Sequence, residues 1–439
     1  MNKIIVFVWL VLGCAGAVKA QQHTAAVKEL LVNKLNRLPA HIKRPAEVKS
    51  FYIASGYTMA WLGNDSAMAH LWKLINNAPA WGLQLTWYTP GLLQKGRRLA
   101  TTSDSVDADI EITGAAIQFF GDIAYGSAPE VGYNGLSYKP SYANIPLLLW
   151  AAAPTGQLNM LLRQIEPACP EYNAFKTEIA KCLQDTMARC KPGNWQALVK
   201  GISTVRWLYG LRQQNRAVIV VNIPSATLLV YNAKEVLLSS KVIVGKMSTH
   251  TPLLCSQVTE VVLYPYWMVP ATIATRELLP MIKRNPGYID ANGFQVLSGN
   301  GKILNPYSID WSVLSAGNFP YVLRQSTGCD NSLGLVKLNF YSPYDVYLHD
   351  TPWKKLFAFD KRFFSHGCIR VEKAIELGRF VLDDNAMAID TLTEKGCLYH
   401  QRPINVPVKE KIPVCVLYNT AWVDAAARVR FYKDVYKRF

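Results

Sequence analysis

Apolar positions recur at helical spacing through the first half of the chain. In the segment VKELLVNKLNRL, the apolar residues from Val27 to Leu38 fall on one face, which predicts an amphipathic helix that Pro39 ends. Similar patterns predict further helices at about 66–78, 110–125, 157–166 and 173–190. We therefore expect residues 24–211 to form a helical domain.

The pattern changes near Arg216, where short apolar runs rich in β-branched residues replace the helical spacing. AVIVVNI, ATLLVY and VLLSSKVIVG are separated by turn residues, and TEVVLYPYWMVP, LVKLNFY and DVYLHD follow. Runs of this kind predict β-strands. Near the end, KAIELGRFVL predicts a helix and PVCVLY another strand. Residues 215–439 are thus expected to form a β-rich domain, which makes the chain an α+β protein.

A segment at about 271–325 interrupts the predicted strands. It begins with the helix-like run ATRELLPMIKR and continues with a stretch rich in Gly, Asn and Pro. Ordered insertions of this length beside a catalytic site often act as lids. We expect an inserted subdomain here, and a simple surface elaboration is the alternative.

The first twenty residues have the pattern of a secretory signal peptide. Lys3 precedes the apolar run Ile4–Leu12, and Val18-Lys19-Ala20 fits a signal-peptidase site, so we expect 1–20 to be removed on export. A second interpretation is a lipoprotein signal, in which Cys14 would carry the lipid anchor. No later stretch reaches the roughly 18–20 apolar residues that a membrane-spanning helix needs.

The chain is basic, with a formal net charge of +16 over 439 residues. Such a surface suits an anionic partner, for example nucleic acid, a membrane or a cell-wall polymer, and it also occurs without any such partner. The chain has no zinc-finger spacing, dense Lys/Arg block or RNA-binding aromatic signature, so we expect no nucleic-acid function. Nine cysteines without a CxxC pair or a Cys/His comb make a metal site unexpected.

The segments YLHDTP and SHGCIRV carry the most informative chemistry. A cysteine attacks as its thiolate, and a neighbouring histidine can remove the thiol proton. His349 ends a strand pattern and precedes Cys368 by a short segment, which makes Cys368 a candidate nucleophile and His349 its candidate base. A buried structural cysteine, a papain-like protease or an amidase would fit the same pair.

Residues beside Cys368 fit an acyl-transfer site. Gly367 permits a tight backbone turn and close approach of a substrate. Backbone N–H groups at Gly367 and Cys368 could form an oxyanion hole. Arg370 lies two residues beyond Cys368, on the same face of a strand, where it could lower the pKa of the thiol or bind a carboxylate.

Ser-His-Gly-Cys-Ile-Arg, with fifteen residues between His349 and Ser365, resembles the signature of the L,D-transpeptidase (YkuD-type) catalytic domain. VVNIPSATLLVY, YPYWMVP, NSLGLVKLNF and VLYNTAWVD extend the resemblance over about 215–439, to a longer periplasmic subgroup. The first half is similar to the helical scaffold domain of that subgroup, and 271–325 corresponds to its capping subdomain. The chain departs from the subgroup in two places: 150–211 is too short for a full peptidoglycan-binding module, and Gly328-Cys329-Asp330 replaces a Pro-Gly-Pro-like turn.

The resemblance implies an acyl transfer on peptidoglycan. Cys368 would attack the carbonyl of the third residue of a tetrapeptide stem, a diamino acid, and release D-alanine. The thioester would pass to the side-chain amine of another stem and form a 3→3 cross-link, without a metal or cofactor. His349 would be the base, and the remaining site residues would bind substrate or shape the site: Arg370, His366, Tyr347, Trp267, Ser365 and Asp350, the last with its carbonyl orienting the imidazole.

The acceptor of the acyl group stays open at this level. Water would make the enzyme an L,D-carboxypeptidase, and a protein lysine would make it an anchoring enzyme. A non-catalytic wall-binding factor is an alternative from another class. The resemblance also implies a periplasmic location and covalent inhibition by carbapenems.

Overall fold

The computed structural model describes residues 25–89, 100–138, 140–184, 190–383, 389 and 401–438. The predicted signal peptide and Cys14 lie outside these residues. The chain forms two compact units: the first holds residues up to Pro129, Tyr138–Leu211 and Ala421–Phe431, and the second holds Glu130–Ser137, Arg212–Thr420 and Tyr432–Phe439. None of the helices in the described ranges is long and apolar enough to cross a membrane.

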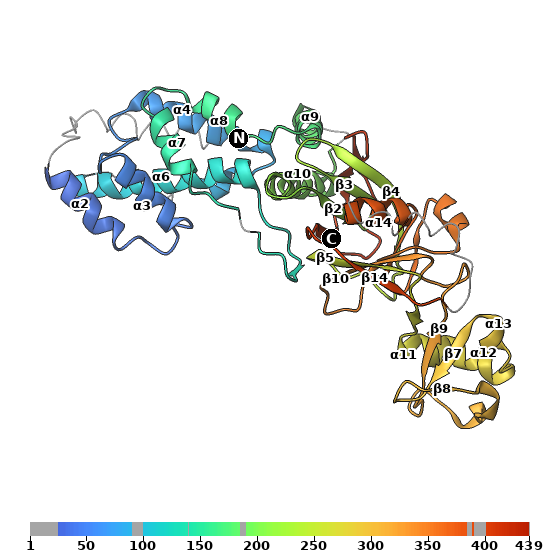
Figure 1. Ribbon diagram of the computed structural model, residues 1–439. Coiled ribbons are helices and arrows are strands. Elements are labelled where there is room, and N and C mark those ends of the chain that lie inside the picture. The colour runs from blue at the N-terminus through green and yellow to red at the C-terminus, as the bar shows by residue number, and fades with distance from the viewer. Residues whose placement is uncertain are drawn as a thin grey trace. The chain divides into compact units, whose positions relative to one another are not determined.

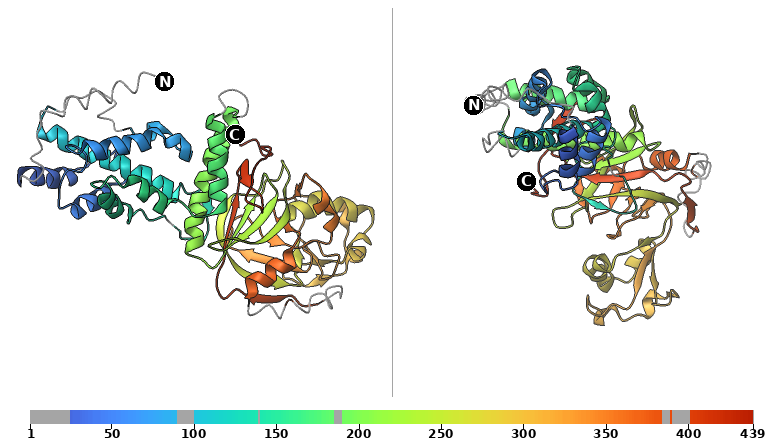
Figure 2. Two further views of the ribbon diagram at one scale, coloured as in Figure 1. Left: turned by 90° about the horizontal axis from the view of Figure 1, so that it is seen from above. Right: turned by 90° about the vertical axis from the view of Figure 1, so that its left-hand side faces the viewer.

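The first unit is helical, as the periodicity predicts (Figures 1 and 2). Its centre is the long helix α6 (Thr102–Tyr125), whose first turn is closed by a capping box between Thr101 and Asp104. Because α6 is apolar on most of its circumference, it is buried rather than amphipathic. The other helices are α2 (Ala25–Leu35), α3 (Pro45–Ala54), α4 (Asp65–Asn76), α7 (Ile145–Ala152), α8 (Leu158–Ile165), α9 (Pro170–Gln184) and α10 (Pro192–Gln213).

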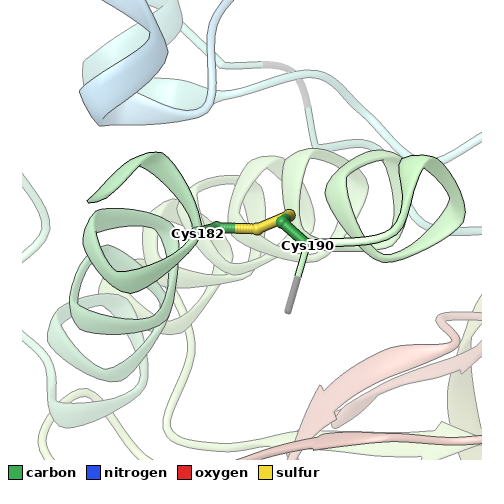
Figure 3. The surroundings of a disulfide bond; sticks show 2 residues. All are labelled: Cys182 and Cys190. Carbon is green, nitrogen blue, oxygen red and sulfur yellow. A yellow bond between two sulfur atoms is a disulfide. The ribbon is translucent and has the colours of Figure 1, made fainter. Parts of the chain in front are cut away.

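A disulfide between Cys182 and Cys190 joins the end of α9 to the residues before α10 (Figure 3). Cys329 is also disulfide-bonded. Among the described cysteines, Cys255, Cys368 and Cys415 are free, and of these three only Cys368 is not fully buried. The candidate nucleophile is therefore a free thiol within reach of solvent.

The second unit is built on a sheet that closes on itself. The strand order is β5-β10-β11-β13-β4-β3-β2-β15, and β15 pairs with β5 as well as with β2. The strands are β2 (Val218–Asn222), β3 (Thr227–Tyr231), β4 (Val236–Gly245), β5 (Leu254–Leu263), β10 (Val336–Phe340), β11 (Leu348–His349), β13 (Ile369–Val371) and β15 (Pro413–Leu417). Three further short strands pair with this sheet: β1 (Gly132–Tyr133) and β14 (Ile404–Pro407) pair with β5, and β12 (Phe363–Ser365) pairs with β4.

The core of this sheet is rich in the β-branched residues that the sequence pattern marks. Ile219, Val242 and Val261 belong to one buried cluster, and α14 (Ala374–Leu382) adds Leu377 to it. Every residue of β2 is buried, which explains its continuous apolar run. The predicted α+β fold, helical first and β-rich afterwards, is confirmed.

An inserted subdomain lies between β5 and β10, drawn in yellow and orange in Figure 1. Its small sheet has the order β6-β9-β7-β8, with β6 (Trp267–Met268), β7 (Phe294–Leu297), β8 (Ile303–Leu304) and β9 (Val322–Gln325). Helices α11 (Ala271–Ile273), α12 (Leu279–Arg284) and α13 (Tyr288–Ala291) share an apolar cluster with this sheet. Between α11 and α12, Ala274–Leu278 form a π-helical turn, a feature frequently found at functional sites.

Candidate active site

Three neighbouring strands place the predicted residues on one face of the sheet. In the parallel pair β11–β13, Leu348 lies opposite Ile369 and His349 opposite Arg370. Side chains alternate along a strand, so Tyr347 and His349 project to the same face as Cys368 and Arg370. The pairing of β11 with β13 thus brings together two segments that are separate in the sequence.

The turn before Cys368 needs a glycine. Gly367 has a φ of +124°, a conformation that residues with a Cβ rarely adopt. Its carbonyl accepts a hydrogen bond from Thr251 Oγ1 (2.8 Å), and its N–H donates to Ser365 Oγ (3.1 Å). Since the Gly367 N–H is bound within the turn, Gly367 and Ser365 shape the backbone that presents Cys368.

The sulfur of Cys368 contacts two groups on the loop and strand that precede His349. The thiol donates to the Asp345 carbonyl at 3.6 Å, and Tyr347 hydrogen-bonds to the sulfur through both its backbone and its side chain. Trp267 in turn hydrogen-bonds to the Tyr347 side chain. Burial raises the pKa of the Cys368 thiol, against the opposing effect of Tyr347, Lys337 and Arg370, so the resting cysteine is a neutral thiol.

His349 is oriented by the residue that follows it. The imidazole is buried, with only 4% of the residue exposed, and Nδ1 donates to the Asp350 carbonyl at 2.5 Å. Nε2 therefore carries the lone pair of the neutral ring. Burial, with a further contribution from the nearby cations Arg370 and Lys337, lowers the pKa of His349 to about 3. Within the described residues no hydrogen bond joins His349 to Cys368, and bonds of this kind often tighten only when a substrate is bound.

A cavity of about 1780 Å³ extends from Cys368 to the inserted subdomain. Of the predicted residues, those that line it are Cys368, His349, Arg370, His366, Tyr347, Trp267 and Ser365, whereas Gly367 and Asp350 do not. The Asp350 carboxylate instead accepts from the Leu335 N–H (3.0 Å) and pairs with Lys354. Asp350 therefore acts on the site through its carbonyl and stabilises the loop with its side chain.

His366 faces the inserted subdomain rather than the sulfur. Its Nε2 lies 2.6 Å from Oε1 of Glu277, which belongs to the π-helical turn. Both side chains are partly exposed at the rim of the cavity. The contact joins the motif that carries Cys368 to the inserted subdomain.

Lys337 is a site residue that the sequence interpretation missed. It lies on β10 opposite His349, lines the cavity, and holds its Nζ 4.0 Å from the centre of the Tyr347 ring. Burial lowers its pKa, while Cys368 is the largest influence that raises it. The signal in the sequence is a lysine flanked by apolar residues within the strand LVKLNF. Charged residues are uncommon on half-buried strands, so this lysine indicates a specific role.

The site as a whole contains the groups that nucleophilic acyl transfer uses. It offers a thiol, a neutral imidazole with a free lone pair, hydrogen-bond donors beside the sulfur and cations on both sides. Among the described residues, no group of three His, Cys, Asp or Glu side chains could hold a metal ion.

Comparisons with known proteins give two family matches. Residues 216–396 match the L,D-transpeptidase catalytic domain, and residues 46–179 match the Scaffold domain. A Haemophilus influenzae protein, named provisionally as an L,D-transpeptidase, is 38% identical over 207 residues. This match spans 47% of the chain but only 41% of the relative, so it covers less than half of either protein.

Solved structures give weaker similarities. An L,D-transpeptidase from Mycobacterium smegmatis shares 16% identity, with 46% of this chain and 58% of that chain covered and a TM-score of 0.23. An L,D-transpeptidase in complex with imipenem also shares 16% identity, over 46% of this chain and 59% of that chain, with a TM-score of 0.21. At these scores the overall superposition is poor, and it adds nothing to the geometry of the site.

Proposed function

We propose that the chain forms 3→3 cross-links in peptidoglycan with Cys368 as nucleophile, because residues 216–396 match the L,D-transpeptidase catalytic domain. The observation that carries the proposal is the free Cys368 thiol, held by Tyr347 in the cavity, with the neutral imidazole of His349 on the same face of the sheet. A cysteine and a histidine in this relation are the minimum set for forming and resolving a thioester.

The first half-reaction releases D-alanine. His349 Nε2 takes the proton of the Cys368 thiol as the sulfur attacks the carbonyl of the third stem residue. The tetrahedral intermediate collapses with cleavage of the amide bond, and the proton passes from His349 to the amine of the departing D-alanine. A thioester between Cys368 and the shortened stem remains. The Tyr347 hydroxyl, which interacts with both Cys368 and Trp267, would stabilise negative charge beside the sulfur.

The second half-reaction transfers the acyl group to an amine. The side-chain amine of a diamino acid in a second stem attacks the thioester and loses a proton to His349. The Cys368 thiolate leaves and recovers that proton. Attack by water on the same thioester would give a carboxypeptidase. The cavity of about 1780 Å³ exceeds the roughly 300–1,000 Å³ of common small-molecule sites, which favours room for a second stem.

Carbapenems are proposed as covalent inhibitors on chemical grounds. Their strained lactam carbonyl would accept the Cys368 sulfur in place of the stem carbonyl, and the thioester formed would block the cavity. Intact-protein mass spectrometry would show a single adduct on the wild type and none on Cys368→Ala.

We also propose export to the periplasm, on the basis of the signal-peptide pattern in residues 1–20. Cell fractionation with an epitope-tagged chain tests this location. Release of the mature protein in soluble periplasmic extracts would support cleavage at Ala20, and retention in the membrane would support lipidation of Cys14 instead.

Purified tetrapeptide muropeptides test the reaction itself. The wild type is expected to produce a cross-linked dimer with loss of one D-alanine, whereas Cys368→Ala produces none and His349→Ala loses about 10²–10⁴-fold in rate. Cys415→Ala is the matched control, because it removes a buried cysteine of a strand outside the cavity. Tripeptide without dimer would replace the proposal with a carboxypeptidase, and equal turnover by Cys368→Ala would refute it.

A further inference from the structure

Lys337 carries a charge without a partner inside the cavity. Its Nζ lies over the Tyr347 ring, and no hydrogen bond or ion pair joins it to any described residue. Two acids influence it from nearby: Glu260, whose carboxylate already accepts from Asn339 Nδ2 (2.6 Å), and Asp345 of the loop before Tyr347. Neither of them forms an ion pair with Lys337.

Arg370 repeats this arrangement on the other side of His349. Its guanidinium lies over the Trp353 ring at 5.1 Å and, like Lys337, makes no hydrogen bond or ion pair to a described residue. Lys337 lies opposite His349 on β10, and Arg370 lies opposite His349 on β13. The three side chains therefore form a row across three adjacent strands, in which a neutral imidazole separates two cations.

Partly buried cations normally have an anionic or hydrogen-bonding partner, because removing a charge from water is unfavourable. In the same unit, Lys354 pairs with Asp350, and Arg362 donates to several backbone carbonyls. Lys337 and Arg370 have no such partner among the described residues, and both line the cavity beside Cys368. Their missing partner is thus expected to be a ligand of opposite charge.

We propose that Lys337 and Arg370 form a carboxylate-binding subsite and that Lys337 recognises the free C-terminal carboxylate of the donor peptide. The inference rests on the proposed function, in which the residue after the scissile bond is the last of the stem. Strands lie about 4.8 Å apart, so Lys337 and Arg370 are about two strand spacings from each other, with His349 between them and Cys368 two residues before Arg370. A carboxylate one residue beyond the attacked carbonyl lies within reach of either cation.

Binding at this subsite has a consequence for the base. The two cations disfavour a positive charge on His349. A substrate carboxylate offsets them, which makes the imidazole a stronger base when the donor is in place. The same subsite therefore selects a terminal peptide bond and activates the residue that begins the reaction.

Alkylation of Cys368 tests the subsite without any peptidoglycan substrate. Iodoacetate carries the carboxylate that the subsite should bind, and iodoacetamide is its neutral analogue. The measured quantity is the rate at which iodoacetate alkylates Cys368 divided by the rate with iodoacetamide. This ratio is compared between the wild type and Lys337→Met, and peptide mass spectrometry locates the alkylated residue. The ratio is expected to fall about fivefold in Lys337→Met, the size expected for loss of one charge a few ångströms away. Lys337→Arg should keep it.

Lys361→Met is the matched control, because it removes the same charge from an exposed position outside the cavity. Its ratio should equal that of the wild type. An unchanged ratio in Lys337→Met, with the protein folded by circular dichroism, would overturn the proposal. A ratio that falls equally in Lys361→Met would also overturn it, because the effect would then come from net charge alone.

A pair of donors tests recognition in the reaction itself. The wild type should prefer a tetrapeptide stem with a free C-terminus over its C-terminal amide, with the difference in KM as well as kcat, and Lys337→Met should lose most of this preference. Equal use of both donors by the wild type would overturn the subsite. Absence of turnover with either donor would count against the proposed function, whereas the alkylation ratio would still decide the subsite.

Discussion

Asp109 in the helical unit and Lys337 in the β-rich unit are both charged residues removed from bulk water, but their surroundings differ. The Asp109 carboxylate is fully buried and accepts from the Tyr52 hydroxyl (2.6 Å) and from the backbone N–H groups of residues 60–62. The Nζ of Lys337 lies over the Tyr347 ring and has no hydrogen-bond or ion-pair partner among the described residues. The fold thus supplies the hydrogen-bond donors of Asp109, whereas we expect the partner of Lys337 to be a ligand.

We expect this difference to distinguish residues that stabilise the fold from residues that act on the substrate. A satisfied buried carboxylate holds residues 60–62 against α6, so its removal should affect folding before anything else. An unsatisfied cation stabilises little in the free protein, and its removal should affect substrate handling alone. Four predictions test this division.

The largest effect is expected for Asp109→Ala. The substitution leaves three backbone N–H groups without their acceptor, each costing about 1–3 kcal/mol, so the free energy of unfolding should fall by roughly 3–9 kcal/mol. Chemical denaturation measures it. Asp107→Ala on the same helix removes a partly exposed carboxylate that pairs with Lys34, and it should cost less than about 1 kcal/mol. Similar losses in both variants would contradict the special role of Asp109.

Tyr347→Phe should lower kcat/KM about 10²-fold, equivalent to about 2.7 kcal/mol, with little change in the free energy of unfolding. The phenylalanine keeps the ring but removes the hydroxyl that hydrogen-bonds to the Cys368 sulfur. Tyr341→Phe, at a half-exposed position outside the cavity, is the control and should leave kcat/KM unchanged. A loss below threefold in Tyr347→Phe would show that the hydroxyl has no part in the chemistry.

The pH dependence of kcat/KM should be shallow in the range where histidine side chains usually titrate. Because the folded pKa of His349 is lowered from 6.5 to about 3, the neutral base persists well below pH 6. The acid limb of kcat/KM should therefore lie below pH 5. Because the pKa of His349 is lower in the folded than in the unfolded state, its contribution to the free energy of unfolding is fully present above pH 6.5. This contribution decreases as the pH falls toward 3. A limb near pH 6.5 in kcat/KM would show that His349 is not the free-enzyme base.

The smallest effect is expected for Glu277→Gln. The pair with His366 is partly exposed, and pairs of this kind contribute about 0.2–1 kcal/mol, so kcat/KM should change by less than about fivefold. Glu178→Gln, which removes a surface pair with Lys181 in the helical unit, is the control. A loss above tenfold in Glu277→Gln would place the contact between the inserted subdomain and the motif among the requirements of the reaction.

Local patterns predicted the elements well where one physical signal dominated. The run VLLSSKVIVG predicted a strand, and β4 spans the same ten residues. The helix expected at 157–166 is α8, within one residue at each end. The sequence pattern of 274–284 predicted one helix, but the segment contains a π-helical turn. Propensity scales do not distinguish such a turn from an α-helix.

Long-range pairing lay beyond these patterns. Residues 130–137 belong to the β-rich unit through pairing of β1 with β5, although they stand in the helical half of the sequence. The closure of the sheet through β15 and β5 also joins strands that are distant along the chain. Such pairings depend on which sheet edges meet, and a local run of apolar residues carries no information about its partner.

The sequence by itself determined the chemical groups of the site and their order: a histidine that ends a strand, a glycine, the cysteine and an arginine two residues later. Only the tertiary structure decided which groups share a face, because register across three strands places Lys337 and Arg370 on either side of His349. It also decided which backbone groups are occupied, such as the Gly367 N–H. Residue identity fixes what chemistry is possible, and strand register, which long-range packing sets, fixes where each group acts.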